Sequence, residues 1–222
     1  HQIRGPLTAM KGFASMLVEG DFGELSKEVK DPVEKIYQSS QSLVVIVEDF
    51  LNVSRIEQGR MKYDFSLFDL CELVNQVVDE LRPNIEKTGL TFNVSMDSRQ
   101  KYLINADRGK IKQVLSNLID NSVKYTPKGS VTVTLEKKRG QITFKISDTG
   151  VGIPKDTMPR LFQKFSRAND ANQVNTAGTG LGLYVASEMI KAHHGRIWAE
   201  SAGAGKGSSF FVELSEAQPV LR

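Results

Sequence analysis

The stretch Asp148-Thr149-Gly150-Val151-Gly152-Ile153-Pro154 opens a segment that closes with Gly178-Thr179-Gly180-Leu181-Gly182-Leu183. Between these two glycine clusters the chain is largely polar and has no sustained apolar period. A loop of this length inside a compact domain is usually functional or disordered. The second cluster leads directly into an apolar helical pattern, and a helix N-terminus offers backbone N–H groups to an anion. The sequence therefore predicts a glycine-hinged lid that binds phosphate.

The composition is that of an ordinary globular protein. The chain has 222 residues, a formal net charge of +3, 40% hydrophobic residues and 25% charged residues, which allows one large or two small domains. The basic residues are spread along the sequence, so we predict no nucleic-acid binding. The single Cys71 excludes an internal disulfide, and its apolar helical surroundings predict a buried thiol rather than a nucleophile. There is no signal peptide and no apolar run of about twenty residues, so we predict no membrane segment within these residues. The predicted location is cytoplasmic, with the alternative that the chain is the cytoplasmic portion of a membrane-anchored sensor.

The first sixty residues predict a helical hairpin. Apolar side chains recur at spacings of three and four over residues 1–20 and again over residues 27–57, with a turn between them. Pro6 is expected to kink the first helix. The apolar stripes are too wide for a lone hairpin to cover, so we predict a homodimer that forms a four-helix bundle; the alternative is that both helices pack on the rest of the same chain. His1 lies within the helical pattern, so we expect upstream sequence that carries a sensor domain.

The rest of the chain predicts alternating helices and strands, and hence a second domain. The expected helices cover residues 68–87, 107–124 and 181–194, and the expected strands cover residues 90–96, 102–106, 130–137, 141–147, 196–200 and 208–214. Asp107 is predicted to cap the second of these helices. The pattern therefore places a helical domain at residues 1–59 and an α/β domain at residues 60–222.

The helix at 107–124 carries a group of polar residues with the chemistry of a ligand site. Asn117 and Asn121 are four residues apart and share one helix face. Their amide oxygens are suitable ligands for Mg²⁺, which binds few protein groups and keeps water and phosphate oxygens. Lys124 could hold a phosphate, and Tyr125 could stack on a base. The alternative for this segment alone is two solvated asparagines on an exposed face.

Asp148 follows a predicted strand and is surrounded by glycines. Its carboxylate could accept a hydrogen bond from an exocyclic amine, while Gly150 and Gly152 let backbone approach a ring. An Asp-Thr-Gly sequence is also common in simple turns, and glycine-rich segments are frequent in loops. The hypothesis of a nucleotide site therefore depends on all three clusters occurring together.

Five segments, in chain order, resemble the motifs of two-component sensor histidine kinases. They are the phosphoacceptor H box at His1–Leu7, the N box at Asn117–Tyr125, a glycine box at Asp148–Pro154, the F box at Leu161–Arg167 and a second glycine box at Gly178–Leu183. The resemblance covers essentially the whole chain. It implies an α-helical hairpin in a dimeric four-helix bundle, followed by an α/β sandwich of the Bergerat ATPase type in which three helices back a mixed sheet.

The resemblance also implies roles for individual residues. Asp148 would bind the adenine amine of ATP or ADP, and Tyr125 would pack on the adenine. Asn117 and Asn121 would face Mg²⁺ and the phosphates, with Asn121 preferred as the direct ligand. Lys124 and Arg167 would contact phosphate. The lid and its flanks would be shaped by Gly150, Gly152, Ile153, Gly178, Thr179, Gly180, Leu181, Gly182 and Leu183, and Phe162 and Phe165 would anchor the lid.

The same resemblance implies that His1 is the nucleophile that accepts the γ-phosphoryl group. A neutral imidazole has one ring nitrogen free to attack. The family usually has an acidic residue after this histidine, whereas Gln2 can fix the tautomer but cannot take a proton. The family also has a polar side chain four residues after the histidine, where this chain has Gly5. We therefore expect slower phosphorylation and weak phosphatase activity.

We weigh three candidate functions, and the residues argue against the third. The first is a protein-histidine kinase that autophosphorylates His1 and passes the phosphate to an aspartate of a response regulator. The alternative is a nucleotide-binding signalling module of kinase descent in which Gln2 has weakened or abolished phosphotransfer. A gyrase-like or chaperone-like ATPase would need a catalytic glutamate one turn before Asn121, and this chain has Asn117 there.

Overall fold

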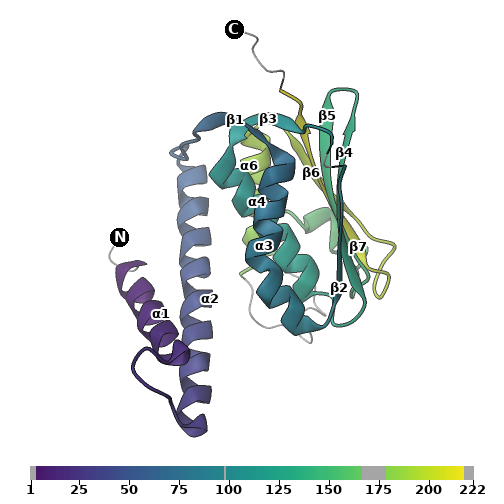
Figure 1. Cartoon of the computed structure of the whole chain (residues 1–222). Helices are drawn as coiled ribbons and strands as arrows, with labels where there is room; N and C mark the ends of the chain where they lie inside the picture. Colours follow the sequence, from purple (N-terminus) through teal and green to yellow (C-terminus); the bar gives the residue numbers. More distant parts are fainter. Residues whose placement is uncertain (1–3, 98, 167–178, 218–222) are drawn as a thin grey trace. The chain divides into compact units, whose positions relative to one another are not determined.

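The structure is a computed structural model that describes residues 4–97, 99–166 and 179–217. It divides into two compact units, a helical unit that ends at Arg60 and an α/β unit that begins at Met61. The predicted fold class, a helical hairpin followed by an α/β sheet domain, is confirmed (Figure 1). Within the described ranges, no helix has both the length and the apolar character that a membrane crossing requires.

The helical unit is a hairpin of α1 (Arg4–Glu19) and α2 (Lys27–Glu57). Helix α1 includes Pro6, which lies in the first turn of the described helix. Ser26 is the N-cap of α2, but its side chain makes no capping hydrogen bond. Many large apolar side chains of the hairpin are exposed, among them Phe13 at 63% and Ile36 at 54%.

The α/β unit contains a two-stranded and a five-stranded sheet. Strands β1 (Phe65–Asp69) and β3 (Leu103–Asp107) pair antiparallel. The larger sheet has the order β2-β4-β5-β7-β6. Its strands are β2 (Thr91–Ser95), β4 (Ser130–Lys138), β5 (Gln141–Asp148), β6 (Arg196–Glu200) and β7 (Ser208–Ser215). Adjacent strands of this sheet pair antiparallel, except for β2 and β4, which pair parallel.

Three helices cover one face of the larger sheet (Figure 1): α3 (Leu70–Thr88), α4 (Arg108–Lys124) and α6 (Gly182–Ala192). Buried and partly exposed residues alternate strictly along β5, which is the pattern of a sheet with one covered face. The turn between β4 and β5 consists of Arg139 and Gly140, both with positive φ, as a two-residue hairpin turn requires. A short 3₁₀ helix, η1 (Met158–Arg160), follows β5.

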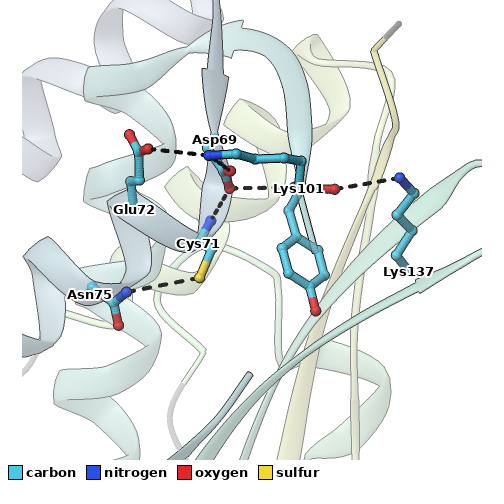
Figure 2. A network of polar contacts seen from close by, with 7 residues as sticks. Asp69, Cys71, Glu72, Asn75, Lys101 and Lys137 are labelled. Carbon is cyan, nitrogen blue, oxygen red and sulfur yellow. Dashed lines mark hydrogen bonds and ion pairs between the residues drawn. The ribbon is translucent and has the colours of Figure 1, made fainter. Parts of the chain in front are cut away.

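Several predicted boundaries differ by one or two residues, and at one of them Phe68, which was expected to begin a helix, lies in β1. The reason is the N-cap Asp69, whose carboxylate accepts a hydrogen bond from the Cys71 backbone N–H at 3.0 Å, so that α3 begins at Leu70, two residues later than predicted. Figure 2 shows that the same buried carboxylate also pairs with the Lys101 ammonium at 3.4 Å. Cys71 is a buried thiol, as predicted; burial raises its pKa, and the charge of Asp69 adds to this shift.

Candidate functional site

Helix α4 supplies the first part of the site. Asp107 caps it, as predicted, by accepting a hydrogen bond from the Lys110 backbone N–H at 3.0 Å. Ile111, Leu115 and Leu118 are fully buried and hold one face of the helix in the core. The outer face therefore presents the polar residues of the C-terminal half.

Asn117 and Asn121 lie side by side on that face, as the four-residue spacing predicted. The Asn121 amide donates to the Asn117 side-chain oxygen at 3.2 Å. The Asn117 amide nitrogen is buried and has no hydrogen-bond partner in the described part of the chain. A buried polar group without a partner is unusual in a folded protein and marks a place where a ligand or an ordered water completes the bonding.

The second glycine cluster lies directly against Asn117. A Cβ atom added to Gly182 would come within 2.7 Å of the Asn117 side-chain oxygen, which is closer than real Cβ contacts. Gly182 is the first residue of α6, so the N-terminus of this helix and the asparagine pair of α4 share one position. An added Cβ at residue 182 would force the Asn117 side chain to move. The backbone N–H groups of the first turn of α6 complete a polar surface suited to an anion.

The carboxyl end of β5 carries Asp148, which is 8% exposed. One carboxylate oxygen accepts from the backbone N–H groups of Gly150, at 2.9 Å, and Ser208, at 3.2 Å. The other accepts from the Ser208 hydroxyl at 2.6 Å. An ionised carboxylate has about four acceptor positions, so three bonds hold it in place and leave capacity for one further N–H donor.

Ser208 is a site residue that the sequence reasoning missed. It lies sixty residues after Asp148, and only the register of β5 against β7 pairs the two positions. Ser201 was missed for the same reason. Its hydroxyl accepts from the Ile153 backbone N–H at 3.0 Å and donates to the Gly207 carbonyl at 2.7 Å, so it ties the loop before β7 to the first glycine cluster. No local motif marks either serine.

The first glycine cluster has a packing role that was not predicted. The prediction that Gly150 and Gly152 let backbone approach a ligand ring stays a prediction. An added Cβ at either position would lie 2.2 Å from a backbone oxygen, that of Tyr125 for Gly150 and that of Gly203 for Gly152. The Val151 N–H also donates to the Tyr125 carbonyl at 3.0 Å. These glycines therefore allow three backbone segments to pack together around the end of α4.

Some of the remaining predicted site residues lie in the part of the chain that the structure describes, and others lie outside it. Tyr125 ends α4, and the Lys124 ammonium lies 5.7 Å from the centre of its ring. Leu181 is buried, and Leu183 is partly exposed. His1, Gln2, Arg167 and Gly178 lie outside the described residues.

The described part of the F box contacts the start of α6. The Lys164 ammonium lies 5.1 Å from the centre of the Tyr184 ring, and an added Cβ at Gly180 would lie 2.9 Å from the backbone of Phe165. Phe165 itself is 68% exposed and has a φ of 60°, so the prediction that it is an apolar anchor is wrong in this structure. Its backbone, not its ring, makes the contact.

Two family models match the chain. Residues 106–218 match the histidine kinase-, DNA gyrase B- and HSP90-like ATPase family, and residues 1–59 match the His Kinase A (phospho-acceptor) domain. The first match alone covers more than half of the chain and contains α4, both described glycine clusters and the β5–β7 pair.

Individual proteins give the same result. The chain is 32% identical over 219 residues to the circadian input-output histidine kinase CikA of Synechococcus elongatus, and 33% identical over 222 residues to the histidine protein kinase DivJ of Caulobacter vibrioides. These matches cover 97% and 100% of this chain but only 29% and 36% of the relatives, so the chain spans about a third of their length. Among solved structures, full-length ShkA in complex with AMPPNP has a TM-score of 0.76 at 28% identity, covering 100% of this chain and 46% of that one. The catalytic domain of the histidine kinase ThkA has a TM-score of 0.61 at 29% identity, covering 70% and 99%.

Proposed function

This chain belongs to the sensor histidine kinases of two-component signalling, and we propose that it transfers the γ-phosphoryl group of ATP to His1 and then to an aspartate of a response regulator. In this proposal residues 1–59 form the phosphotransfer and dimerisation domain, and residues 60–222 form the catalytic domain. The observation that carries the proposal is the contact between Asn117 and Gly182, which brings the N box and the second glycine box into one polar surface.

We assign the base end of the nucleotide to Asp148 and Tyr125. The fixed Asp148 carboxylate has acceptor capacity for the exocyclic amine of adenine, and Ser208 holds its orientation through the 2.6 Å hydroxyl bond. A carboxylate that is already bonded does not have to reorganise when the base arrives, and this favours adenine over a base with a carbonyl at that position. Tyr125, at the end of α4, supplies an apolar ring surface for packing.

We assign the phosphate end to Asn117, Asn121, Lys124 and the first turn of α6, together with Arg167, which lies outside the described residues. The unpartnered Asn117 amide fits a phosphate oxygen or an ordered water, and the Asn121 oxygen fits Mg²⁺. Bound Mg²⁺ would neutralise charge on the phosphates. The residues of the chain itself orient the phosphates and exclude water, which is most of what phosphoryl transfer requires of a protein.

We assign the chemistry of the acceptor to His1 and Gln2, on the basis of the H-box sequence and the family match to residues 1–59. A neutral His1 attacks through one ring nitrogen, and Gln2 can accept the hydrogen bond of the other. Because Gln2 cannot take the proton, the proton must pass to water, and general-base help worth roughly 10²–10⁴-fold is lost.

We propose two partners. The first is a second copy of this chain, because the hairpin exposes large apolar side chains along both helices. The second is the receiver domain of a response regulator, which the family uses as phosphate acceptor. Since both ATP and such regulators occur in the cytoplasm, we place the proposed activity there.

The test is incubation with γ-labelled ATP and measurement of acid-labile phosphate on the protein. We expect label on the wild type, none on His1→Ala, and at least tenfold faster labelling of Gln2→Glu. Gly182→Ala should bind ATP about tenfold to a hundredfold more weakly, since overpacking of this kind costs about 1–3 kcal/mol. The matched control is Gly12→Ala, where an added Cβ meets nothing within 4 Å. ATP binding without any labelling of wild type or Gln2→Glu would instead establish the nucleotide-binding module without phosphotransfer.

A further inference from the structure

A buried histidine at the far end of α6 lies outside the nucleotide site. His193 is the C-cap of this helix and is 8% exposed. Its Nδ1 lies 2.7 Å from the Met189 carbonyl oxygen, and its Nε2 lies 2.9 Å from the Asp107 backbone nitrogen. A carbonyl can only accept and a backbone N–H can only donate, so Nδ1 carries the proton and Nε2 is bare. The ring is therefore held in one neutral tautomer by two different elements.

Asp107, the hydrogen-bond partner of His193, also bonds to two further segments, and we call this residue the junction. One carboxylate oxygen caps α4 at the Lys110 N–H, and the other accepts from the Asp64 backbone N–H at 2.9 Å. Burial alone would raise the pKa of this carboxyl, but the backbone donors at Asp64 and Lys110 outweigh it and hold the pKa below its ordinary value. The carboxylate is therefore a stable acceptor, and it joins the segment before β1 to the N-terminus of α4.

Two aromatic rings cover His193, that of Tyr63 in the segment before β1 and that of Phe65, the first residue of β1. The Tyr63 ring meets the imidazole edge-on at a centroid distance of 5.3 Å, and the Phe65 ring lies at 4.9 Å. The chain enters the α/β unit at Met61, so these contacts begin two residues after the boundary between the units. One histidine thus contacts the entering segment through its ring, α4 through Nε2 and α6 through Nδ1.

We propose that His193 is a positioning residue that fastens the entering segment, Tyr63–Phe65, to the catalytic unit, and that this fastening sets the rate of phosphoryl transfer rather than the affinity for ATP. The second half of the inference, on the rate of transfer, rests on the proposed kinase function. Along α4, Asn117 lies ten residues and Lys124 seventeen residues beyond Asp107, so about 15–25 Å separate the junction from the proposed phosphate-binding residues. We therefore expect ATP binding to be unaffected by changes at the junction.

The rate of transfer depends on the junction because the two reacting groups lie on different units. If the segment is released while residues 66–69 of β1 remain paired with β3, residues 61–65 become part of a free tether. Five residues add at most about 18 Å of reach. A longer flexible tether lowers the effective concentration of one unit at the other. Release should therefore slow labelling of the chain without changing how tightly it binds ATP.

The test uses the full chain and three variants. His193→Phe keeps an aromatic ring against Tyr63 and Phe65 but removes both hydrogen bonds. His193→Gln can restore the acceptor for the Asp107 N–H, because the glutamine amide reaches about as far as Nε2. The control is His194→Gln, an exposed neighbour. For each variant we would measure the ATP dissociation constant by calorimetry, the labelling rate at saturating ATP, and amide hydrogen exchange over residues 61–67.

We expect His193→Phe to label about three- to tenfold more slowly, to exchange faster at residues 61–67, and to bind ATP within twofold of the wild type. His193→Gln should recover most of both losses. Equal labelling by His193→Phe and His194→Gln would overturn the proposal, and so would a loss of ATP affinity as large as the loss of labelling. If His193→Phe does not fold, Tyr63→Ala tests the same fastening from the other side, with the hydrogen bonds of His193 intact.

The failure of the kinase function and the failure of this proposal are distinguishable. A chain that binds ATP but never becomes labelled refutes the kinase function, whereas the fastening is still tested by hydrogen exchange. Unchanged exchange at residues 61–67 in both His193→Phe and Tyr63→Ala would refute the fastening even in an active kinase.

Discussion

The two units of this chain solve the problem of burying apolar surface in opposite ways. Among the described residues, thirty buried hydrophobic residues lie in the α/β unit and three in the helical hairpin. Of the fourteen large hydrophobic side chains that are exposed, ten belong to the hairpin. The α/β unit has a core of its own, whereas the hairpin carries the apolar residues of a core without enclosing them. The hairpin is therefore the part for which we propose a second copy of the chain.

The difference follows from the geometry of the elements. A sheet that has one face covered by three helices encloses side chains between two layers, and Phe144 of β5 is fully buried there. Two antiparallel helices can bury only the narrow strip between them, which here includes Leu7 and Ala14. Each helix presents its remaining apolar stripe outward, and a four-helix bundle is the arrangement that covers such stripes.

The largest expected effect comes from making one substitution in each unit. Phe144→Ala should destabilise the α/β unit by about 3–5 kcal/mol, because it removes a fully buried ring and leaves a cavity. Phe13→Ala, at 63% exposure, should change the same unfolding transition by less than about 0.5 kcal/mol. Urea titration followed by the fluorescence of Trp198, the single tryptophan, measures both. Equal effects would show that the two units do not differ in the way described.

The next effect concerns the exposed face of the hairpin. Placing two charges there with Phe13→Glu and Ile36→Glu should weaken self-association at least tenfold, about 1.4 kcal/mol, because apolar burial is lost and like charges are brought together. Light scattering over a range of concentrations gives the molar mass. The control is Phe165→Glu, an equally exposed phenylalanine of the α/β unit. A dimer that survives the double substitution, or one that Phe165→Glu disrupts, would place the association elsewhere.

The smallest effect concerns a surface ion pair of the α/β unit. The Lys112 ammonium bonds to the Glu80 carboxylate and, together with Gln76, lowers the pKa of Glu80 below its ordinary value of 4.5. A lowered folded-state pKa contributes stability above the ordinary value, and this contribution is lost as the pH falls through the lowered pKa. Glu80 is about half exposed, so we expect no more than about 0.5 kcal/mol.

The measurement for this pair compares the unfolding free energies of wild type and Lys112→Ala at pH 7 and at pH 3. The difference between the two proteins should be present at pH 7 and smaller at pH 3. A difference that does not change with pH would mean that Lys112 acts through its aliphatic stem and not through its charge.

Features that depend on near neighbours in the chain could be predicted. The Asp107 cap joins residues three apart, the Asn117–Asn121 pair joins residues four apart, and both are present as expected. Asp148 was placed correctly at the end of a strand. What could not be predicted are the contacts of Ser208 and His193, because their partners lie sixty and eighty-six residues away. Such pairs exist only after strands and helices have taken their register.

The sequence by itself therefore determined the elements, the two units and the family of this protein. Helical and strand periods, caps and turn glycines act over a few residues, so they can be read without a fold. Only the tertiary structure shows which distant residues pack against the glycines of the two clusters. Gly182 makes room for Asn117, and Gly150 makes room for the Tyr125 backbone, although each pair is at least twenty-five residues apart. Close approach between distant segments results from tertiary packing. The sequence pattern does not contain the spatial distance between residues that are far apart in the chain.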